Sequence, residues 1–390
     1  DVLGSRGLGD VYKRQVIMCF LKGAFLLISL KDYAEANGRS SDTVRRLAEQ
    51  GKLFSAHKIG RNWVVDECEP YPSPQHAEWT VASLFSGCGG LDLGFTGDFS
   101  FLGTKYGKLP FKIVWANELN IAACKTYEHN LGSIIQGDIN EKIDLLPKSV
   151  DVVIGGFPCQ DISINGKMRG IKGERSSLYT AIVEAVRRTS PKVFVAENVG
   201  SLLLKTNSDS FSKILEDFST LGYKLDIHRY DASKYGVPQT RDRVFIVGTR
   251  NDLPDFVAPD ETTPNNPITA KEAIDDLAEK PWDKESSHIW SKAKRSGEQG
   301  NRHLIADRPG YTIRAECHGN IQYHYSLPRR ISMREAARIQ SFPDSFQFLS
   351  GLRETERQIG NAVPPVLAWQ LAKQVALVLG GSEQNGPDAV

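Results

Sequence analysis

The sequence lacks an excess of charge of one sign, paired cysteine motifs and any long uninterrupted apolar run. Its 390 residues contain 48 Lys and Arg against 47 Asp and Glu, so a nucleic-acid surface would have to come from local clusters of basic side chains. The six cysteines stand apart without a CxxC pair, which argues against a zinc ribbon or a disulfide framework. We therefore expect no metal site and a reducing, cytoplasmic environment in which a cysteine can be a free nucleophile.

The most apolar stretch lies near the N-terminus, at residues 16–30. Lys22 interrupts it, and it is too short to cross a bilayer, so we expect no membrane association. Residues 5–15, SRGLGDVYKRQ, look like a sequencing adapter translated in frame. We expect residues 1–27 to be an artefact of sequence assembly or disordered, and we base no structural prediction on them.

Residues 28–68 have the pattern of two short amphipathic helices followed by a hairpin. The expected N-caps are Ser29 for the first helix and Ser41 or Asp42 for the second, and Gly60 marks the turn of the hairpin. This pattern resembles the small winged helix-turn-helix domains of the excisionase and MerR type.

That resemblance implies a DNA-binding unit. Its second helix would enter a major groove with Thr43, Arg45 and Arg46, while Lys58 and Arg61 of the hairpin would contact phosphates. A protein-interaction unit, or a purely structural helical cap, remains the alternative.

Beyond a proline-containing linker at residues 69–78, the sequence alternates short β-branched runs with longer helical segments. This alternation predicts an α/β fold with a doubly wound sheet. The expected strands are residues 80–85, 112–117, 133–137, 151–155, 192–196, 224–230 and 243–249. Residues 79–250 would form the catalytic domain, 251–329 a smaller inserted domain, 330–380 a return to the catalytic domain with helices at 332–340 and 365–379, and 381–390 a tail.

A glycine-rich turn follows the first of these strands. Gly87, Gly89 and Gly90 would let the backbone approach a ligand closely, although any α/β protein can contain such a turn. Glu118 and Asp138 end the next two strands, where acids accept hydrogen bonds from a ribose and an adenine. Because no Lys-Ser or Lys-Thr follows the glycines, a nucleoside without phosphates fits better than a phosphate chain.

A cysteine follows the fourth strand, in the segment GGFPCQDIS. Cys159 would lie at the same edge of the sheet as the glycine turn, and Glu197 of VFVAENV would end the neighbouring strand there. A thiol at such a position can react as a thiolate, whereas a buried structural cysteine is the alternative. A thiol and a carboxyl without a histidine do not resemble a protease.

The motifs FxGxGG, PCQ, ENV, QTRDR and QIGNAVPP occur in this order between residues 79 and 379. Together they resemble the DNA cytosine-5 methyltransferase family. The resemblance implies a Rossmann-like S-adenosylmethionine-dependent methyltransferase domain with a small target recognition domain at 251–329. It also implies transfer of a methyl group to C5 of a flipped-out cytosine in a specific DNA sequence, through a covalent adduct with Cys159, in a restriction-modification system or as a phage or orphan enzyme.

The resemblance also assigns roles to individual residues. Glu197 would act on N3 of the base, and Arg241 and Arg243 would hold its O2 and a phosphate. The cofactor would be bound by the glycine turn, by the acids with their neighbours, and by the residues that pack around the pocket: Phe85, Gly87, Gly89, Gly90, Glu118, Leu119, Asp138, Ile139, Phe157, Pro158, Leu178, Asn361 and Ala362. Asn361 resembles a residue at a helix start, and Ala362 replaces a common Ser.

Two further segments complete the expected site. Residues 160–176, with three glycines and four basic side chains, resemble a mobile lid on phosphates. The inserted segment mixes aromatic and basic groups suited to reading DNA, namely Trp282, Trp290, Lys292, Lys294, Arg295, Arg302, Tyr311, Arg314 and His318. Arg334 and Glu335, which follow it, are expected to stabilise this domain.

The expected partner is double-stranded DNA, the expected by-product is S-adenosylhomocysteine, and the chain would act as a monomer in a bacterial or phage-infected cell. A cognate restriction endonuclease would not be needed for activity. An amino-methyltransferase is disfavoured because Phe-Pro-Cys-Gln stands where Asp/Ser-Pro-Pro-Tyr/Phe would be required. A transfer-RNA cytosine-5 methyltransferase and a non-catalytic DNA-binding regulator stay open as alternatives.

Overall fold

The structure is a computed structural model that describes residues 27–37, 39–49, 53, 56–60, 62–66, 78–157, 178–292, 302–315, 322–380 and 388–389. The chain divides into two compact units, Asp1–His76 and Ala77–Val390. Each unit is described by itself.

The first unit contains two helices and a three-stranded sheet. Its elements are β1 (Leu27–Ser29), α2 (Leu30–Ala36), α3 (Ser41–Glu49), β2 (His57–Ile59) and β3 (Asn62–Asp66), and the strand order is β1-β3-β2. The predicted helix pair and hairpin are therefore confirmed. Ser29 caps α2 as expected, but the cap of α3 is Ser40, whose hydroxyl accepts from the Thr43 N–H at 3.2 Å. The expected cap at Ser41 or Asp42 is wrong because both residues already lie inside the helix.

The second unit is built on a seven-stranded sheet. Its strands are β4 (Trp79–Leu84), β7 (Phe111–Glu118), β8 (Ile135–Gln136), β9 (Val152–Gly156), β10 (Val193–Val199), β11 (Tyr223–Asp231) and β12 (Asp242–Arg250), in the order β11-β12-β10-β9-β4-β7-β8. All seven predicted strands are present. The sheet is mixed, since β12 runs antiparallel to both of its neighbours.

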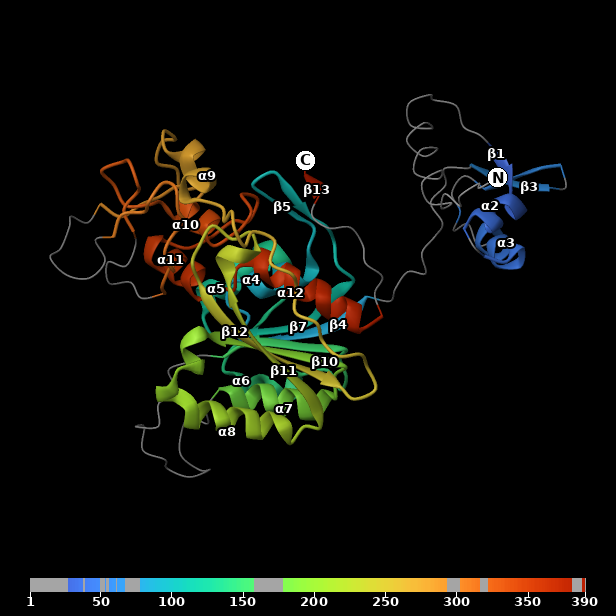
Figure 1. The fold of residues 1–390 in the computed structure, drawn as a ribbon, viewed down its shortest axis with the longest axis horizontal. Coiled ribbons are helices and arrows are strands. Elements are labelled where there is room, and N and C mark those ends of the chain that lie inside the picture. Colours follow the sequence, from blue (N-terminus) through green and yellow to red (C-terminus); the bar gives the residue numbers. More distant parts are fainter. Residues whose placement is uncertain are drawn as a thin grey trace, which may run out of the picture. The chain divides into compact units, whose positions relative to one another are not determined.

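Helices cover both faces of this sheet (Figure 1). One face carries α4 (Gly90–Thr96), α5 (Ile121–Leu131) and α12 (Pro365–Val378), and the other carries α6 (Ile139–Lys142), α7 (Tyr179–Thr189) and α8 (Ser208–Ser219). Two separate apolar clusters fill the space on the two faces, as expected for a doubly wound sheet.

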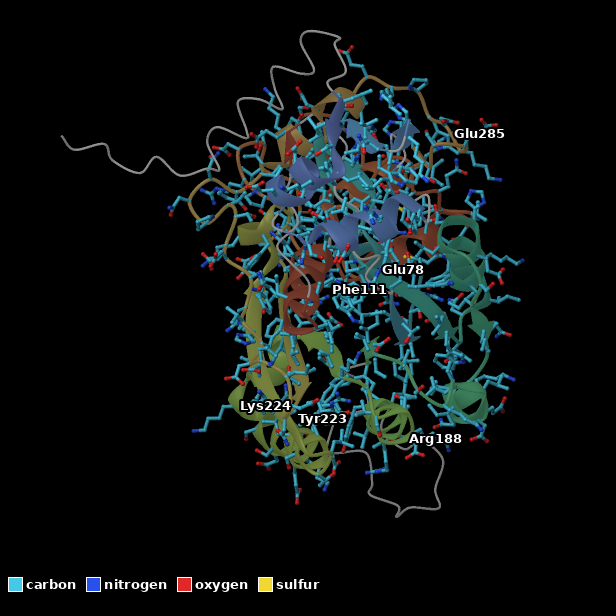
Figure 2. The ribbon with its side chains drawn as sticks, turned by 90° about the vertical axis from the view of Figure 1, so that its right-hand side faces the viewer. Glu78, Phe111, Arg188, Tyr223, Lys224 and Glu285 are labelled. Atoms are coloured by element: carbon cyan, nitrogen blue, oxygen red, sulfur yellow. The ribbon has the colours of Figure 1, made fainter. Side chains whose placement is uncertain are left out.

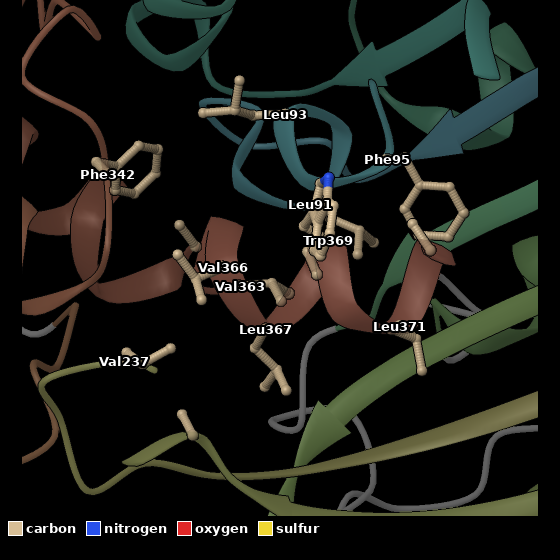
Figure 3. Close-up of a cluster of buried hydrophobic side chains, with 14 of the residues drawn as sticks. Leu91, Leu93, Phe95, Val237, Phe342, Val363, Val366, Leu367, Trp369 and Leu371 are labelled. Atoms are coloured by element: carbon tan, nitrogen blue, oxygen red, sulfur yellow. The ribbon is translucent and has the colours of Figure 1, made fainter. Parts of the chain in front are cut away.

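Helix α12 returns from the far end of the sequence to pack against α4 (Figure 3). Trp369 lies beside Leu91 and Phe95 in this cluster, and it is 1% exposed. A Cβ on Gly94 would lie 2.2 Å from Cβ of Ala368, so only glycine permits this close approach of the two helices.

The segment after β12 is largely irregular, as predicted. It contains the short helix α9 (Ala270–Ile274) and leads to α10 (Met333–Ile339) and α11 (Leu352–Asn361). Glu285 of this segment lies at the opposite end of the unit from Arg188 and Tyr223 (Figure 2). Arg334 is buried and donates to the carbonyls of Ser286, Pro343 and Phe346, which confirms its expected structural role.

Several elements were not predicted. A hairpin of β5 (Phe99–Phe101) and β6 (Thr104–Tyr106) follows α4, β13 (Asp388–Ala389) pairs with β6 inside the expected tail, and α11 precedes the QIGN motif. Strand β8 has two residues instead of the five expected, and both glycines that flank it, Gly132 and Gly137, have positive φ angles.

Candidate active site

The carboxyl ends of parallel strands bring the predicted residues to one edge of the sheet. Strands β10, β9, β4, β7 and β8 are parallel neighbours, so Glu197, Phe157, Phe85, Glu118 and Asp138 all lie at or just beyond the ends of adjacent strands. Ligands of α/β sheets bind at this edge. These functional groups therefore lie in a row along one edge of the sheet.

The glycine turn between β4 and α4 needs its glycines for three different reasons. Gly87 has φ +57°, and a Cβ there would meet nothing within 4 Å, so this residue faces open space. Gly89 has φ +96°, and its Cβ would lie 2.2 Å from Leu131 Cδ1. A Cβ on Gly90 would lie 2.4 Å from the carbonyl oxygen of Val363. The turn is therefore closed by packing on its inner side and open at Gly87.

Glu118 is tied to this turn. Its Oε2 accepts from the Gly87 N–H at 2.9 Å, and its Oε1 accepts from the Asn120 N–H at 2.8 Å. The next residue, Leu119, exposes 65% of its surface beside this carboxylate. An acid at the end of the second strand with an exposed apolar neighbour is the arrangement that binds a ribose and shields its base.

Asp138 and Ile139 follow β8. Asp138 is exposed and caps α6, since its Oδ1 accepts from the Asn140 N–H at 2.9 Å. Ile139 is buried in the same apolar cluster as Phe157, with Phe85 and Leu178 packed against that cluster. Four of the apolar residues predicted to surround the cofactor thus belong to one cluster, although they come from four separate segments.

These residues fit S-adenosylmethionine. The open glycine turn leaves room for an amino-acid group, and the two acids at strand ends suit a nucleoside without phosphates. The donors and acceptors of this edge are backbone amides and carboxylates, which match the ammonium, carboxylate and ribose hydroxyls of that cofactor.

Glu197 forms a buried ion pair with Arg243. Arg243 Nε lies 2.7 Å from Glu197 Oε1, and the two side chains are 9% and 10% exposed. Burial raises the pKa of Glu197, and the nearby guanidinium groups of Arg243 and Arg241 oppose this shift. A Cβ on Gly156 would lie 2.8 Å from Glu197 Oε2, so a glycine on the adjacent strand makes room for the carboxyl.

The chain leaving β9 is braced against the residues around Glu197. The Phe157 N–H donates to the Glu197 carbonyl at 3.3 Å, and the Asn198 side chain donates to the Phe157 carbonyl at 3.0 Å. Pro158, Cys159 and the predicted lid at 160–176 lie outside the described residues. Cys159 follows Phe157 by two residues, so its Cα is at most about 7 Å from that of Phe157.

Arg241 has a different environment from the one predicted. It is 1% exposed, and its terminal nitrogens donate to the carbonyls of Ile313, Gly360 and Ala362 at 2.7–3.0 Å. Because its Nη atoms are occupied by backbone oxygens of distant segments, we revise its expected contact with the base to a structural role. Arg243 pairs with Glu197, and its expected contact with the base stays a prediction.

Asn361 also differs from its prediction. It is the last residue of α11 and not the start of a helix, since α12 begins at Pro365. Residues 362–364 separate the helices, and Pro365 is the first residue of α12, a position that tolerates proline. Ala362 is buried near Gly90, and its carbonyl accepts from Arg241 and Gln340.

Several structural residues of the site were missed. Gln239 is fully buried, donates to the Ile339 carbonyl at 3.1 Å and accepts from the Ile313 N–H at 3.0 Å, and Asn198 holds Phe157. Both stand inside motifs that the sequence displays, QTRDR and ENV, so their position in a motif was the available signal. Of the DNA-reading candidates, Lys294, Arg295 and His318 lie outside the described residues.

No helix among the described residues is long and apolar enough to cross a membrane.

Comparison with known proteins identifies the family. A family model described as C-5 cytosine-specific DNA methylase matches residues 79–312 and 290–376. The chain is 37% identical to the type II methyltransferase M.NgoFVII of Neisseria gonorrhoeae over 332 residues, which cover 76% of this chain and 86% of that protein. It is 34% identical to M.FnuDI of Fusobacterium nucleatum over 349 residues, with 78% and 96% covered.

Solved structures support the same fold. The S. pombe Dnmt2 methyltransferase superimposes with a TM-score of 0.56 over 77% of this chain and 98% of that one, at 19% identity. At this identity the likeness concerns the fold alone. Together with the sequence matches, it places this chain among the C-5 cytosine-specific DNA methylases, as a DNA (cytosine-5)-methyltransferase that uses S-adenosylmethionine.

Proposed function

We propose that this enzyme methylates C5 of a flipped-out cytosine in a specific double-stranded DNA sequence through a covalent bond to Cys159. The observation that carries the proposal is the brace between Phe157 and residues 197–198, because it keeps the chain two residues before Cys159 against the buried Glu197–Arg243 pair. A nucleophile and a charged pair at one strand edge are what this reaction needs.

The thiolate of Cys159 adds to C6 of cytosine, and the displaced electron pair moves through the ring toward N3. Glu197 receives this charge by donating a proton or a hydrogen bond to N3, a role supported by the raised pKa of its buried carboxyl. The cofactor supplies the methyl group that C5 attacks. A water or hydroxide then takes the C5 proton, the N3 proton returns to Glu197, and the thiolate of Cys159 is expelled, which restores the ring.

The two cysteines that the structure describes, Cys88 and Cys124, are poorly suited to act as the nucleophile, which favours Cys159. Cys88 is fully buried, and burial raises the pKa of its thiol; burial also raises the pKa of Cys124 to about 11. A thiol with a raised pKa is a poor nucleophile at neutral pH.

Arg243 would contact the target base beside Glu197, while residues 85–90, Glu118, Leu119, Asp138 and Ile139 hold the cofactor. Flipping the base costs roughly a few kcal/mol, which contacts with the pocket would offset. The position of these residues at one strand edge and the family motifs support both assignments.

The segment 251–329 would choose the target sequence. Its described part contains stacked cation–aromatic pairs, in which Arg302 lies 5.6 Å from the ring centre of Tyr311 and Arg329 lies 4.5 Å from that of Trp290. Trp282 is 52% exposed. Packing on Tyr311 would orient the guanidinium of Arg302 for phosphates and base edges, whereas the guanidinium of Arg329 is held by the carboxylate of Glu335.

The relatives named above are type II methyltransferases, and we infer a restriction-modification setting in a bacterial cell. A cognate restriction endonuclease would share the target sequence without being required for methylation. The enzyme would act as a monomer on one DNA duplex in the cytoplasm.

The test is a methylation assay on the full chain. DNA incubated with labelled S-adenosylmethionine should gain 5-methylcytosine at one sequence, mapped by deamination sequencing. DNA containing 5-fluorocytosine should trap the enzyme covalently. Cys159→Ser should abolish trapping and turnover, whereas the matched control Cys124→Ser should keep both. Trapping of Cys159→Ser would contradict the proposed nucleophile.

For the N-terminal unit we infer a second DNA contact of the helix-turn-helix type. Helix α3 buries Val44 and Ala48 against α2 and exposes Arg45 and Arg46, which make no ion pair or hydrogen bond with any described residue. The edge strand β2 exposes Lys58, whose Nζ lies 5.3 Å from the ring centre of Trp63. A helix with an unpaired basic face beside a basic hairpin suits a groove and its phosphates.

This contact is tested with DNA that lacks the methylation target. Replacing Arg45 and Arg46 together by Ala should weaken binding and lower the salt dependence by roughly two counterions, because each neutralised phosphate contributes about one. Lys31→Ala, on the exposed face of α2, is the matched control. Unchanged affinity of the double variant would favour a protein-interaction or structural unit.

A further inference from the structure

A fully buried carboxyl lies directly beneath the glycine turn. Asp92, in the first turn of α4, is 0% exposed. Its Oδ1 accepts from the hydroxyl of Tyr127 at 2.8 Å, whereas its Oδ2 has no hydrogen-bond partner among the described residues. A buried oxygen of this kind is costly to the fold, so its presence needs an explanation.

Tyr127 connects this carboxyl to the turn itself. The Tyr127 ring packs under Gly89, because a Cβ on Gly89 would lie 2.9 Å from its Cδ2. On the other side of the turn, the hydroxyl of Ser86 donates to that of Ser83 at 2.8 Å. Asp92 therefore supports the glycine turn from below through Tyr127, whose ring packs under Gly89.

The negative charge of Asp92 acts electrostatically on a residue of the glycine turn. Burial raises the pKa of Asp92 to about 6, so most of the carboxyl is ionised at pH 7.5. Burial also raises the pKa of Cys88, and the negative charges of Glu118 and Asp92 add to that shift. Cys88 lies between Gly87 and Gly89, so the negative charge of Asp92 acts within the glycine turn.

We propose that Asp92 is a positioning residue for the cofactor: through Tyr127 it fixes the glycine turn, and its charge favours S-adenosylmethionine over the product. S-adenosylmethionine carries one positive charge more than S-adenosylhomocysteine, at the sulfonium. A buried carboxylate near the turn therefore stabilises the substrate form of the cofactor preferentially. The inference rests on the proposed role of residues 85–90 in holding the cofactor.

The protonation of Asp92 sets the pH dependence. Its pKa in the folded chain is about 6, above the ordinary value of 3.8, so ionisation of the buried group disfavours the folded state as the pH rises through 6. Asp92→Asn removes this cost. At pH 8 the variant should unfold at a temperature equal to or above that of the wild type, although it binds the cofactor more weakly. A merely structural residue would lower both quantities together.

The experiment measures dissociation constants of S-adenosylmethionine and S-adenosylhomocysteine by calorimetry on the full chain, between pH 5 and pH 8. Asp92→Asn should raise the dissociation constant of S-adenosylmethionine at pH 8 by roughly tenfold, the factor expected for one interaction with a charged group. It should raise that of S-adenosylhomocysteine less. In the wild type the preference for the charged cofactor should fall below pH 6, and in the variant it should be independent of pH.

Tyr127→Phe should weaken the binding of both ligands without altering the ratio of their dissociation constants. It removes the hydrogen bond that holds the turn but leaves the Asp92 carboxyl in place. The matched control is Tyr230→Phe, which removes a buried hydroxyl that has no hydrogen-bond partner among the described residues. The proposal would be overturned if Asp92→Asn lost affinity for both ligands equally and also unfolded at a lower temperature. Unaltered binding in Glu118→Gln would instead overturn the cofactor site on which it rests.

Discussion

Replacing Glu197 by Gln separates the chemical role of this residue from its structural one. Gln keeps an oxygen that can accept from Arg243 Nε, now 2.7 Å from Glu197 Oε1, but it neither carries charge nor donates a proton as a carboxylic acid does. Losing one charge-assisted hydrogen bond costs about 1.5–3 kcal/mol of stability. Losing the acid that receives charge in the transition state lowers the rate by roughly 10²–10⁴-fold.

Glu197→Ala should behave differently. It leaves the guanidinium of Arg243, which is 9% exposed, with the Asp242 carbonyl as a hydrogen-bond acceptor at 2.6 Å. Removing one partner of a buried ion pair costs about 3–5 kcal/mol, more than the Gln variant loses. The two variants should therefore differ in stability but share the loss of turnover.

The assay combines thermal unfolding with single-turnover transfer of labelled methyl groups to DNA. The matched control is Glu78→Gln, which neutralises one side of an exposed ion pair with Lys108 and should change neither quantity. Turnover of Glu197→Gln within tenfold of the wild type would refute the role of Glu197 in accepting charge. Loss of turnover with full retention of the covalent adduct would instead place its effect after Cys159 has added.

Three other substitutions test how the site is held. Gly90→Ala should cost about 1–3 kcal/mol and weaken cofactor binding, because the new Cβ would lie 2.4 Å from the Val363 carbonyl, whereas Gly107→Ala, with nothing within 4 Å, should be tolerated in denaturant unfolding. Arg241→Met should lower stability by several kcal/mol by removing the Arg241 donor from the carbonyls of Ile313, Gly360 and Ala362, of which only the last keeps a second donor among the described residues, Gln340, and a loss below about 1 kcal/mol would contradict the structural role. Trp369→Phe should lose about 1 kcal/mol in the same assay with the hydrogen bond to the Gly107 carbonyl, and an unchanged midpoint would show that this bond does not stabilise the fold.

The strands and motif residues were predictable because their causes are local. Strands that are buried on both faces of a parallel sheet have apolar, β-branched sequences, and the strand predicted at 192–196 overlaps β10, which extends three residues further. The ends of parallel strands must meet at one edge, so the neighbourhood of Glu118 and Glu197 followed from strand order alone.

The remaining elements depend on contacts that are distant in sequence. Strand β8 is short because only Asn117 and Glu118 pair with it, and the Asn117 side chain replaces further strand bonds by donating to the Ile135 and Gly137 carbonyls. Helix α11 lacks a side-chain cap, so its start gives no sequence signal. The hairpin β5–β6 is stabilised by stacking of Phe99 on Tyr106, which no short-range pattern reveals.

For Arg241 the sequence motif could be recognised, but the role of the side chain could not be predicted from it. The sequence places it beside Arg243, and both look like base-contacting arginines. Strand alternation does not separate them, because residues two apart share a face of a strand. Arg241 instead precedes β12, which begins at Asp242, and its Nη atoms donate to the carbonyls of Ile313, Gly360 and Ala362, whereas Arg243 pairs with Glu197.

Residues near the C-terminus pack against the glycine turn that is proposed to bind the cofactor. Gly90 packs against residues 362 and 363, Arg241 and Gln340 bind the Ala362 carbonyl, and α12 covers α4. The turn that opens the catalytic unit therefore has no packed inner wall until the segment 360–378 has docked on it. Because contacts with such large sequence separation form only after long loops close, we infer that cofactor binding competence arises late in folding, and that a bound cofactor stabilises the docked C-terminal helix as well as the turn.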